Sequence, residues 1–161
     1  SQELSGVPEF RKHNNVTAST EGWGLCSEFF PKEMGFYEDP YSDFGRLAME
    51  LWRAARLVVD TGIHDKKWTR TEAIDYLLAN TPNPKNDCEK AIERYIVMPG
   101  QATAYKIGMM KILELRESAK DKLQEKFDIR VFHDTVINSG PVPLSILEER
   151  VDNWINKELE S

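Results

Sequence analysis

Three groups of polar residues in this sequence have spacings that would place each group on one helix face. The first is Glu21 and Glu28, seven residues apart in the segment TEGWGLCSE. An ordinary solvated face is the simpler interpretation of two exposed carboxylates. However, Gly22 and Gly24 favour a functional interpretation, because each costs a helix interior about 1 kcal/mol relative to Ala. Glycines in a helix suit a close approach to its backbone.

The second group is Arg56, Asp60 and His64, which follow one another at intervals of four within RAARLVVDTGIH. An Asp one turn from both an Arg and a His would hold both in fixed rotamers. The alternative is a buried structural network without a chemical role.

The third group is Gln101 and Tyr105 in PGQATAYKIG, again four residues apart. Ala104 and Gly108 have a small-x-x-x-small spacing, which would let another helix come close. The Tyr105 hydroxyl would be able to donate a hydrogen bond to an oxyanion. The alternative is a core tyrosine whose hydroxyl is already satisfied.

Several familiar sites are excluded by spacing. His13, His64 and His133 form no H-E-x-x-H pair and no zinc-finger pattern. There is no G-x-S-x-G elbow, no P-loop and no dinucleotide fingerprint. Cys26 and Cys88 predict either one disulfide or two free buried thiols, so they do not settle the compartment.

The elements that would position these groups are all helices. Capping residues and helix breakers predict about seven helices and no convincing strand, packed as an irregular all-α bundle with short loops. Ser19 or Thr20 is expected to cap the first, Thr69 with Glu72 to form a capping box, and Asp128 to cap a late helix. The predicted helices cover about 20–35, 42–61, 69–80, 86–97, 101–125 and 128–138, and a last one from Pro143.

Composition is that of one folded domain. The chain has 161 residues, of which 40% are hydrophobic and 30% charged. Its net charge of −6, without a basic cluster, argues against a nucleic-acid partner. No apolar run approaches the ~20 residues of a membrane span. We expect an irregular arm over residues 1–17 and a single helical domain over 18–161.

Taken together, these segments resemble the C-terminal part of the bacterial DUF885 proteins. The resemblance covers about residues 18–156, with the motifs in the same order. They are EGWGLCSE, GRLAMELWRAARLVVDTGIH, WTRTEAIDYL, ERYIVMPGQATAYKIG, FDIRVFHD and VPLSILEERVDNWI. The family is similar to helical zinc metallopeptidases of the gluzincin type, often exported or lipid-anchored. The resemblance therefore implies the bacterial cell envelope or periplasm, and the C-terminal portion of a larger helical protein.

The resemblance also implies residue roles. In the family, an H-E-x-x-x-P-G-H-type helix upstream supplies two His ligands and the general base, which makes Glu21 the third zinc ligand. Gly22 and Gly24 would let this helix lie close to the metal-bearing helix. The resemblance also implies that Glu28 orients a zinc ligand, with Asp60 as a supporting residue. It implies that Tyr105 and His64 take part in catalysis. Substrate binding is implied for Arg56 and Gln101, and again for His64. His133 and Asp134 match the family pattern without an assigned role.

Two departures limit what this chain would do alone. Cys26 stands where the family usually has Tyr, and the upstream His-Glu helix is missing. We therefore expect a C-terminal fragment of a zinc-dependent peptidase for short peptides, inactive and without a cofactor by itself because one carboxylate does not hold zinc.

Two alternatives stay open. One is a non-catalytic helical peptide-binding or scaffold module, whose exposed apolar surface, left by the missing N-terminal half, would favour self-association. The other is a self-contained helical protein whose carboxylates are merely solvated.

Overall fold

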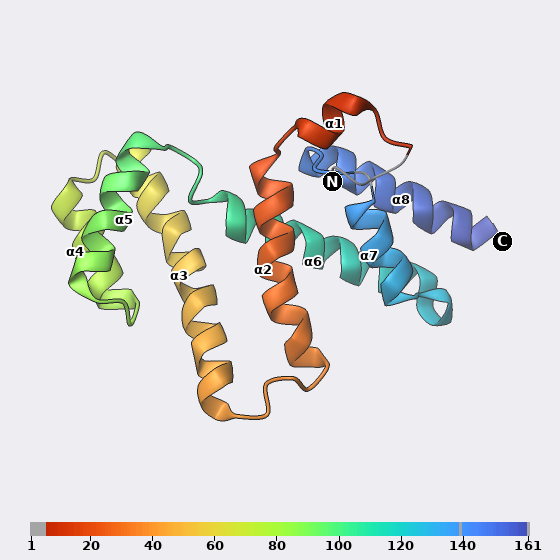
Figure 1. Ribbon diagram of the computed structural model, residues 1–161, viewed down its shortest axis with the longest axis horizontal. Coiled ribbons are helices and arrows are strands. Elements are labelled where there is room, and N and C mark those ends of the chain that lie inside the picture. Colours follow the sequence, from red (N-terminus) through yellow and green to blue (C-terminus); the bar gives the residue numbers. More distant parts are fainter. Residues whose placement is uncertain (1–5, 139, 161) are drawn as a thin grey trace. The chain divides into compact units, whose positions relative to one another are not determined.

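A computed structural model describes residues 6–138 and 140–160, and the all-α prediction is confirmed. Within these residues there are eight α-helices, one 3₁₀ turn (Gln124–Lys126) and no strand. The helices are α1 (Glu9–His13), α2 (Thr17–Glu33), α3 (Pro40–His64), α4 (Arg70–Asn80), α5 (Lys85–Val97), α6 (Ala104–Leu123), α7 (Ile129–Ile137) and α8 (Leu144–Glu160) (Figure 1). None of the described helices is both long and apolar enough to cross a bilayer.

Capping residues close in sequence stabilise several of the helix ends. The Thr69 hydroxyl accepts the N–H of Glu72, and the Glu72 carboxylate accepts the N–H of Thr69, which completes the expected capping box. Asp128 caps α7 as predicted, through the N–H of Arg130. Pro40 stands in the first turn of α3 behind the capping residue Asp39.

Three boundary predictions are wrong. Helix α2 begins at Thr17, ahead of the expected caps Ser19 and Thr20. Gly62 does not end α3, which continues to His64. It lies inside the helix, where the Trp68 ring covers it. Helix α6 begins at Ala104, because residues 101–103 form turns after Gly100, whose φ is +80°.

The chain divides into two compact units. One comprises Ser1–Trp23 with Ile107–Ser161, and the other comprises Gly24–Lys106. The expected single domain over 18–161 stays a prediction. Within the expected arm 1–17, the structure has the short helix α1, and residues 1–5 lie outside the described part.

In the unit Gly24–Lys106, helices α3, α4 and α5 pack against one another (Figure 1). Their shared core is Trp52, Ala55, Val59, Ala73, Ile74, Leu77, Cys88, Ile92, Tyr95 and Ala102. The spacing of apolar residues predicts one stripe along α3, made of Leu47, Leu51, Ala54, Ala55, Val58 and Val59. That expectation is wrong in part, because Leu47, Leu51 and Val58 are exposed. Helix α3 has apolar residues on two faces, and only the face with Trp52, Ala55 and Val59 is buried in this core.

In the other unit, α7 and α8 pack together, and side chains of α6 reach α8. Phe132 of α7 is fully buried beside Trp154 of α8, with ring centroids 6.3 Å apart. A part-buried salt bridge from Lys111 to Glu148 and an exposed one from Lys122 to Asp152 join α6 to α8. The exposed pair of Lys122 and Asp152 contributes little to stability.

Candidate functional site

Two arginines of α3 lie over the ring of Tyr105, which is in the first turn of α6. The guanidinium carbon of Arg56 is 5.1 Å from the Tyr105 ring centroid, and that of Arg53 is 5.6 Å away. Both distances fall within the range in which a cation is attracted to an aromatic face. All three side chains are half-buried. The sequence singled out Arg56 and Tyr105, and the structure brings them together.

Arg56 is enclosed by two further rings. Its guanidinium carbon is 5.6 Å from the centroid of Trp52 and 5.8 Å from that of Tyr95. Burial lowers the pKa of Arg56, and the nearby positive charges of Arg53 and Arg94 act in the same direction. Burial also raises the pKa of Tyr95, which keeps that phenol neutral. This is therefore a cationic site lined by aromatic rings.

A short hydrogen-bonded chain orients the Tyr105 hydroxyl. Arg94 donates to Oε1 of Gln101 at 2.7 Å, and Nε2 of Gln101 lies 3.5 Å from the Tyr105 hydroxyl as a donor. Because a guanidinium only donates, it fixes which end of the Gln101 amide carries the oxygen. Tyr105 is then the acceptor from Gln101, and its own proton is directed elsewhere. The expected helical face shared by Gln101 and Tyr105 is wrong, since Gln101 precedes α6, but the two side chains still meet.

Asp60 does not link Arg56 to His64 as the spacing predicted. Its side chain is buried, and both carboxylate oxygens accept the N–H of Gly100, at 3.1 and 3.2 Å. His64 instead pairs through Nε2 with the backbone carbonyl of Tyr95 at 2.9 Å. Within the described residues, no ion pair connects Asp60 to Arg56 or His64. Asp60 thus anchors the Pro99–Gly100 turn that presents Gln101 and Tyr105.

The proposed metal ligand stands apart from this cluster in the sequence. Glu21 is a half-buried residue of α2 in the unit that contains Ser1–Trp23, whereas Glu28 belongs to the unit Gly24–Lys106. Over the described part of the chain, no three His, Cys, Asp or Glu side chains gather as a metal site. A zinc site takes three or four protein ligands, so these residues do not by themselves fit the ion.

The glycines beside Glu21 have different surroundings. A Cβ added to Gly22 would lie 2.5 Å from Cα of Gly108, whereas one added to Gly24 would meet nothing within 4 Å. The close approach that the sequence predicted at Gly22 is therefore made by α6 of this same chain. The approach expected at Gly24 stays a prediction.

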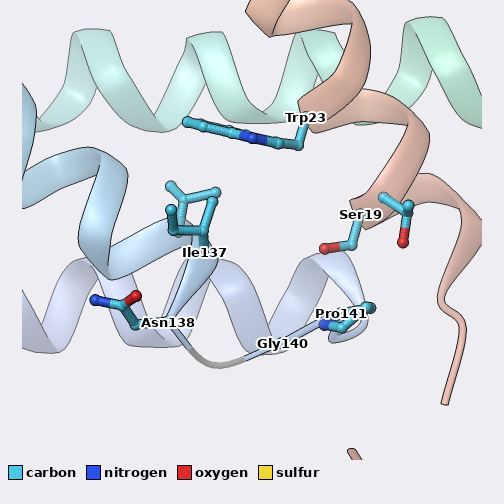
Figure 2. A pocket seen from close by; sticks show the side chains of 8 residues that line it. Ser19, Trp23, Ile137, Asn138, Gly140 and Pro141 are labelled. Atoms are coloured by element: carbon cyan, nitrogen blue, oxygen red, sulfur yellow. The ribbon is translucent and has the colours of Figure 1, made fainter. Parts of the chain in front are cut away.

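An open pocket of about 330 Å³ lies between α2 and the end of α7 in the same unit. Figure 2 shows the Trp23 indole on one side, Ile137 facing it, and the Ser19 side chain directed toward the space. The Trp23 and His133 rings form a T-shaped pair, with centroids 5.1 Å apart. Burial lowers the pKa of His133, and Arg116 lowers it further. Sequence reasoning missed this pocket, although FHD had drawn attention to His133.

Comparison with protein families decides which family this is. The profile described as "Bacterial protein of unknown function (DUF885)" matches residues 1–151. The chain belongs to the DUF885 family. The match confirms the predicted resemblance to DUF885. The similarity to zinc metallopeptidases stays a proposal.

A solved structure agrees with the family membership. "The crystal structure of the putative lipoprotein from Colwellia psychrerythraea" contains a chain that is 49% identical to this one, with a TM-score of 0.90. The match covers 92% of this DUF885 chain and 26% of the Colwellia chain. This chain thus spans about a quarter of the length of that relative. A search of curated proteins found no match.

Proposed function

We propose that this chain is the C-terminal part of a zinc-dependent peptidase that hydrolyses short peptides, in which Tyr105 stabilises the oxyanion. The observation that carries the proposal is the orientation of the Tyr105 hydroxyl. It accepts from Gln101, which Arg94 holds, so its proton is available to a substrate oxygen. The two guanidiniums over its ring add positive potential where negative charge would develop.

The chain's own residues have limited roles in this proposal. The hydrogen bond between Asp60 and Gly100 fixes the turn before α6 and so holds Tyr105 in place. Glu21 would supply one zinc ligand, with Glu28 orienting the ligand set. Zinc would act as the Lewis acid of the hydrolysis. The remaining ligands and the general base would come from polypeptide outside this chain, as the 26% coverage of the Colwellia relative permits.

The test uses the full-length protein that carries this chain. We expect Tyr105→Phe to lower kcat by about 10²-fold, because one oxyanion donor is lost, while bound zinc stays unchanged. Glu21→Gln should abolish both zinc binding and peptidase activity. Tyr41→Phe is the matched control, because Tyr41 is 85% exposed and should leave activity as it was. Full turnover by Tyr105→Phe would disprove the role of the phenol, and full activity with bound zinc in Glu21→Gln would disprove the ligand.

A second candidate function is favoured by the exposed face of α3. Its large apolar side chains, all at least 39% exposed, are Tyr41, Phe44, Leu47, Leu51 and Val58. Such a face suits a non-catalytic peptide-binding or scaffold module that associates with itself or with polypeptide outside this chain. Sedimentation that depends on concentration, together with no zinc and no peptidase activity in the full-length protein, would favour this function.

Location follows the same resemblance. The Colwellia relative is described as a "putative lipoprotein". This description supports a place in the bacterial cell envelope for this chain. Fractionation of cells that produce the full-length protein would check it: recovery in the cytosolic fraction would contradict an envelope location.

A further inference from the structure

A pair of half-buried arginines has no acidic partner among the residues that the structure describes. Arg53 and Arg56 are three residues apart on α3 and share the face of Tyr105. Nε of each is buried and has no hydrogen-bond partner. Nη1 of Arg53 donates to Sδ of Met49, a weak acceptor, at 3.8 Å. Buried donors are costly when unsatisfied, so two of them side by side call for an acceptor.

The carboxylates that would ordinarily neutralise this pair are engaged elsewhere. Glu50, three residues before Arg53, accepts from Arg46 at 3.0 Å and from Lys106 at 2.6 Å. Asp60, four residues after Arg56, gives both oxygens to the N–H of Gly100. Both acids at helical pairing distance are therefore occupied. The lack of a carboxylate beside the two arginines does not reflect a shortage of acidic residues, since the chain has 27 Asp and Glu against 21 Lys and Arg.

The surroundings of the pair favour an anion with planar geometry. The rings of Trp52, Tyr95 and Tyr105 surround the Arg56 guanidinium, with ring centroids 5.1 to 5.8 Å from its central carbon. A guanidinium edge matches a carboxylate through two parallel hydrogen bonds. The like charges of Arg53, Arg56 and Arg94 repel one another, and a bound anion would relieve that repulsion.

We infer that Arg53 and Arg56 form the binding site for a carboxylate of the peptide substrate. The site lies over the Tyr105 ring, so a carboxylate bound there would place the neighbouring part of the peptide against that side chain. The name "substrate" rests on the proposed function, whereas carboxylate binding does not. Arg53 is the new specificity residue, and the substrate class is a peptide that presents a free carboxylate, either at its C-terminus or on an acidic side chain.

Binding to this chain tests the inference without any hydrolysis. The probes are N-acetyl-Ala-Ala with a free C-terminal carboxylate, its C-terminal amide, and N-acetyl-Asp-Ala amide, which carries a carboxylate only on a side chain. Binding is followed by calorimetry or by NMR titration of the Tyr105 and Arg side-chain signals. We expect the free acid to bind at least about tenfold more tightly than N-acetyl-Ala-Ala amide, because a charge-assisted contact is lost. The Asp probe then shows whether a side-chain carboxylate is accepted in place of the terminal one.

Two variants and one control locate the site. Arg53→Gln and Arg56→Gln should each weaken binding of the free acid by about tenfold. Arg70→Gln is the control, because Arg70 is an exposed residue of α4 that pairs with Glu93 at 2.6 Å, and it should bind like the wild type. Circular dichroism checks folding. Arg56→Gln loses contacts with three aromatic rings and can unfold for that reason. In that case Arg53→Gln decides whether the arginines bind the carboxylate, because, among the described aromatic rings, Arg53 contacts only that of Tyr105.

The outcomes are distinct from those of the proposed function. Equal binding of acid and amide, no binding of any carboxylate probe, or equal weakening by Arg53→Gln and Arg70→Gln would overturn the inference. Such a result would leave the role of Tyr105 in the full-length protein intact. Conversely, selective carboxylate binding with an unaffected Tyr105→Phe enzyme would support the inference and contradict the oxyanion role.

Discussion

Gly22 of α2 and Gly108 of α6 meet backbone to backbone. A Cβ on Gly22 would lie 2.5 Å from Cα of Gly108, and a Cβ on Gly108 would overlap the carbonyl oxygen of Ala18. Real Cβ atoms do not make such contacts with rigid backbone, so the two helices cross here only because both positions lack a side chain. The segment GWG therefore has a packing function within this chain, whatever else approaches it.

This crossing makes Gly22 and Gly108 sensitive to the smallest substitution. Gly22→Ala and Gly108→Ala should each lower the free energy of unfolding by about 1–3 kcal/mol, because the helices must move apart. Gly24→Ala is the matched control two residues along α2, where an added Cβ meets nothing, and it should raise stability by up to about 1 kcal/mol. Urea denaturation measures all three. A neutral Gly22→Ala would mean that the crossing is not made in solution.

Two glycines of α3, Gly62 and Gly45, allow the effect of side-chain packing on stability to be measured apart from the effect of helix propensity. A Cβ on Gly62 would lie 2.5 Å from the Trp68 ring, whereas one on Gly45 would meet nothing within 4 Å. Gly62→Ala should displace the indole, shift Trp fluorescence and cost about 1–3 kcal/mol. Gly45→Ala should leave fluorescence unchanged and stabilise the helix. Identical melting curves for the two variants would contradict this arrangement.

The buried Asp60 anchor predicts a local effect of its removal. Asp60→Ala takes away the acceptor for the Gly100 N–H and should cost about 1.5–3 kcal/mol, the range for hydrogen bonds to charged groups. The turn before α6 should loosen, so amide exchange should accelerate at residues 100–105 more than in α4. Asp75→Ala is the control, since Asp75 is an exposed acid on α4. Uniform exchange across the unit would argue against a local anchor.

Asp128 predicts a pH dependence with a definite sign. Hydrogen bonds from the side chain and backbone of Arg130 lower the pKa of Asp128 from 3.8 to about 2. Because the folded pKa lies below the unfolded one, its contribution is complete above about pH 3.8 and is lost as the pH falls toward 2. Carboxyl ¹³C NMR should find this titration near 2, and Arg130→Ala should move it upward. An unchanged midpoint in Arg130→Ala would contradict the assignment to Arg130.

The helices and many of their ends were readable from the sequence because the signals are local. The capping box at Thr69, the cap at Asp128 and the Pro–Gly break at 99–100 each depend on residues within a few positions of one another. The misplaced ends have non-local causes. Gly62 signals a helix stop by itself, but here it makes room for Trp68, which a sequence pattern does not show.

The candidate site divides in the same way. The sequence identified Arg56, Gln101 and Tyr105 as polar residues on otherwise apolar segments, and the family resemblance suggested their roles. It did not find Arg53, although two arginines three residues apart on an apolar helix are a usable signal. Nor did it assign the partner of Asp60, which lies 40 residues away along the chain.

What the sequence by itself determined is therefore the helical class, the capped helix ends and the DUF885 membership, since periodicity, capping and motif order are written in short stretches. Only the tertiary structure decided that Gly22 meets Gly108, that Asp60 anchors Gly100, and that Arg53 and Arg56 converge on Tyr105. Those relationships join residues far apart in the chain. They arise because buried helix faces must pack closely and buried polar groups must find partners, which spacing within one segment does not specify.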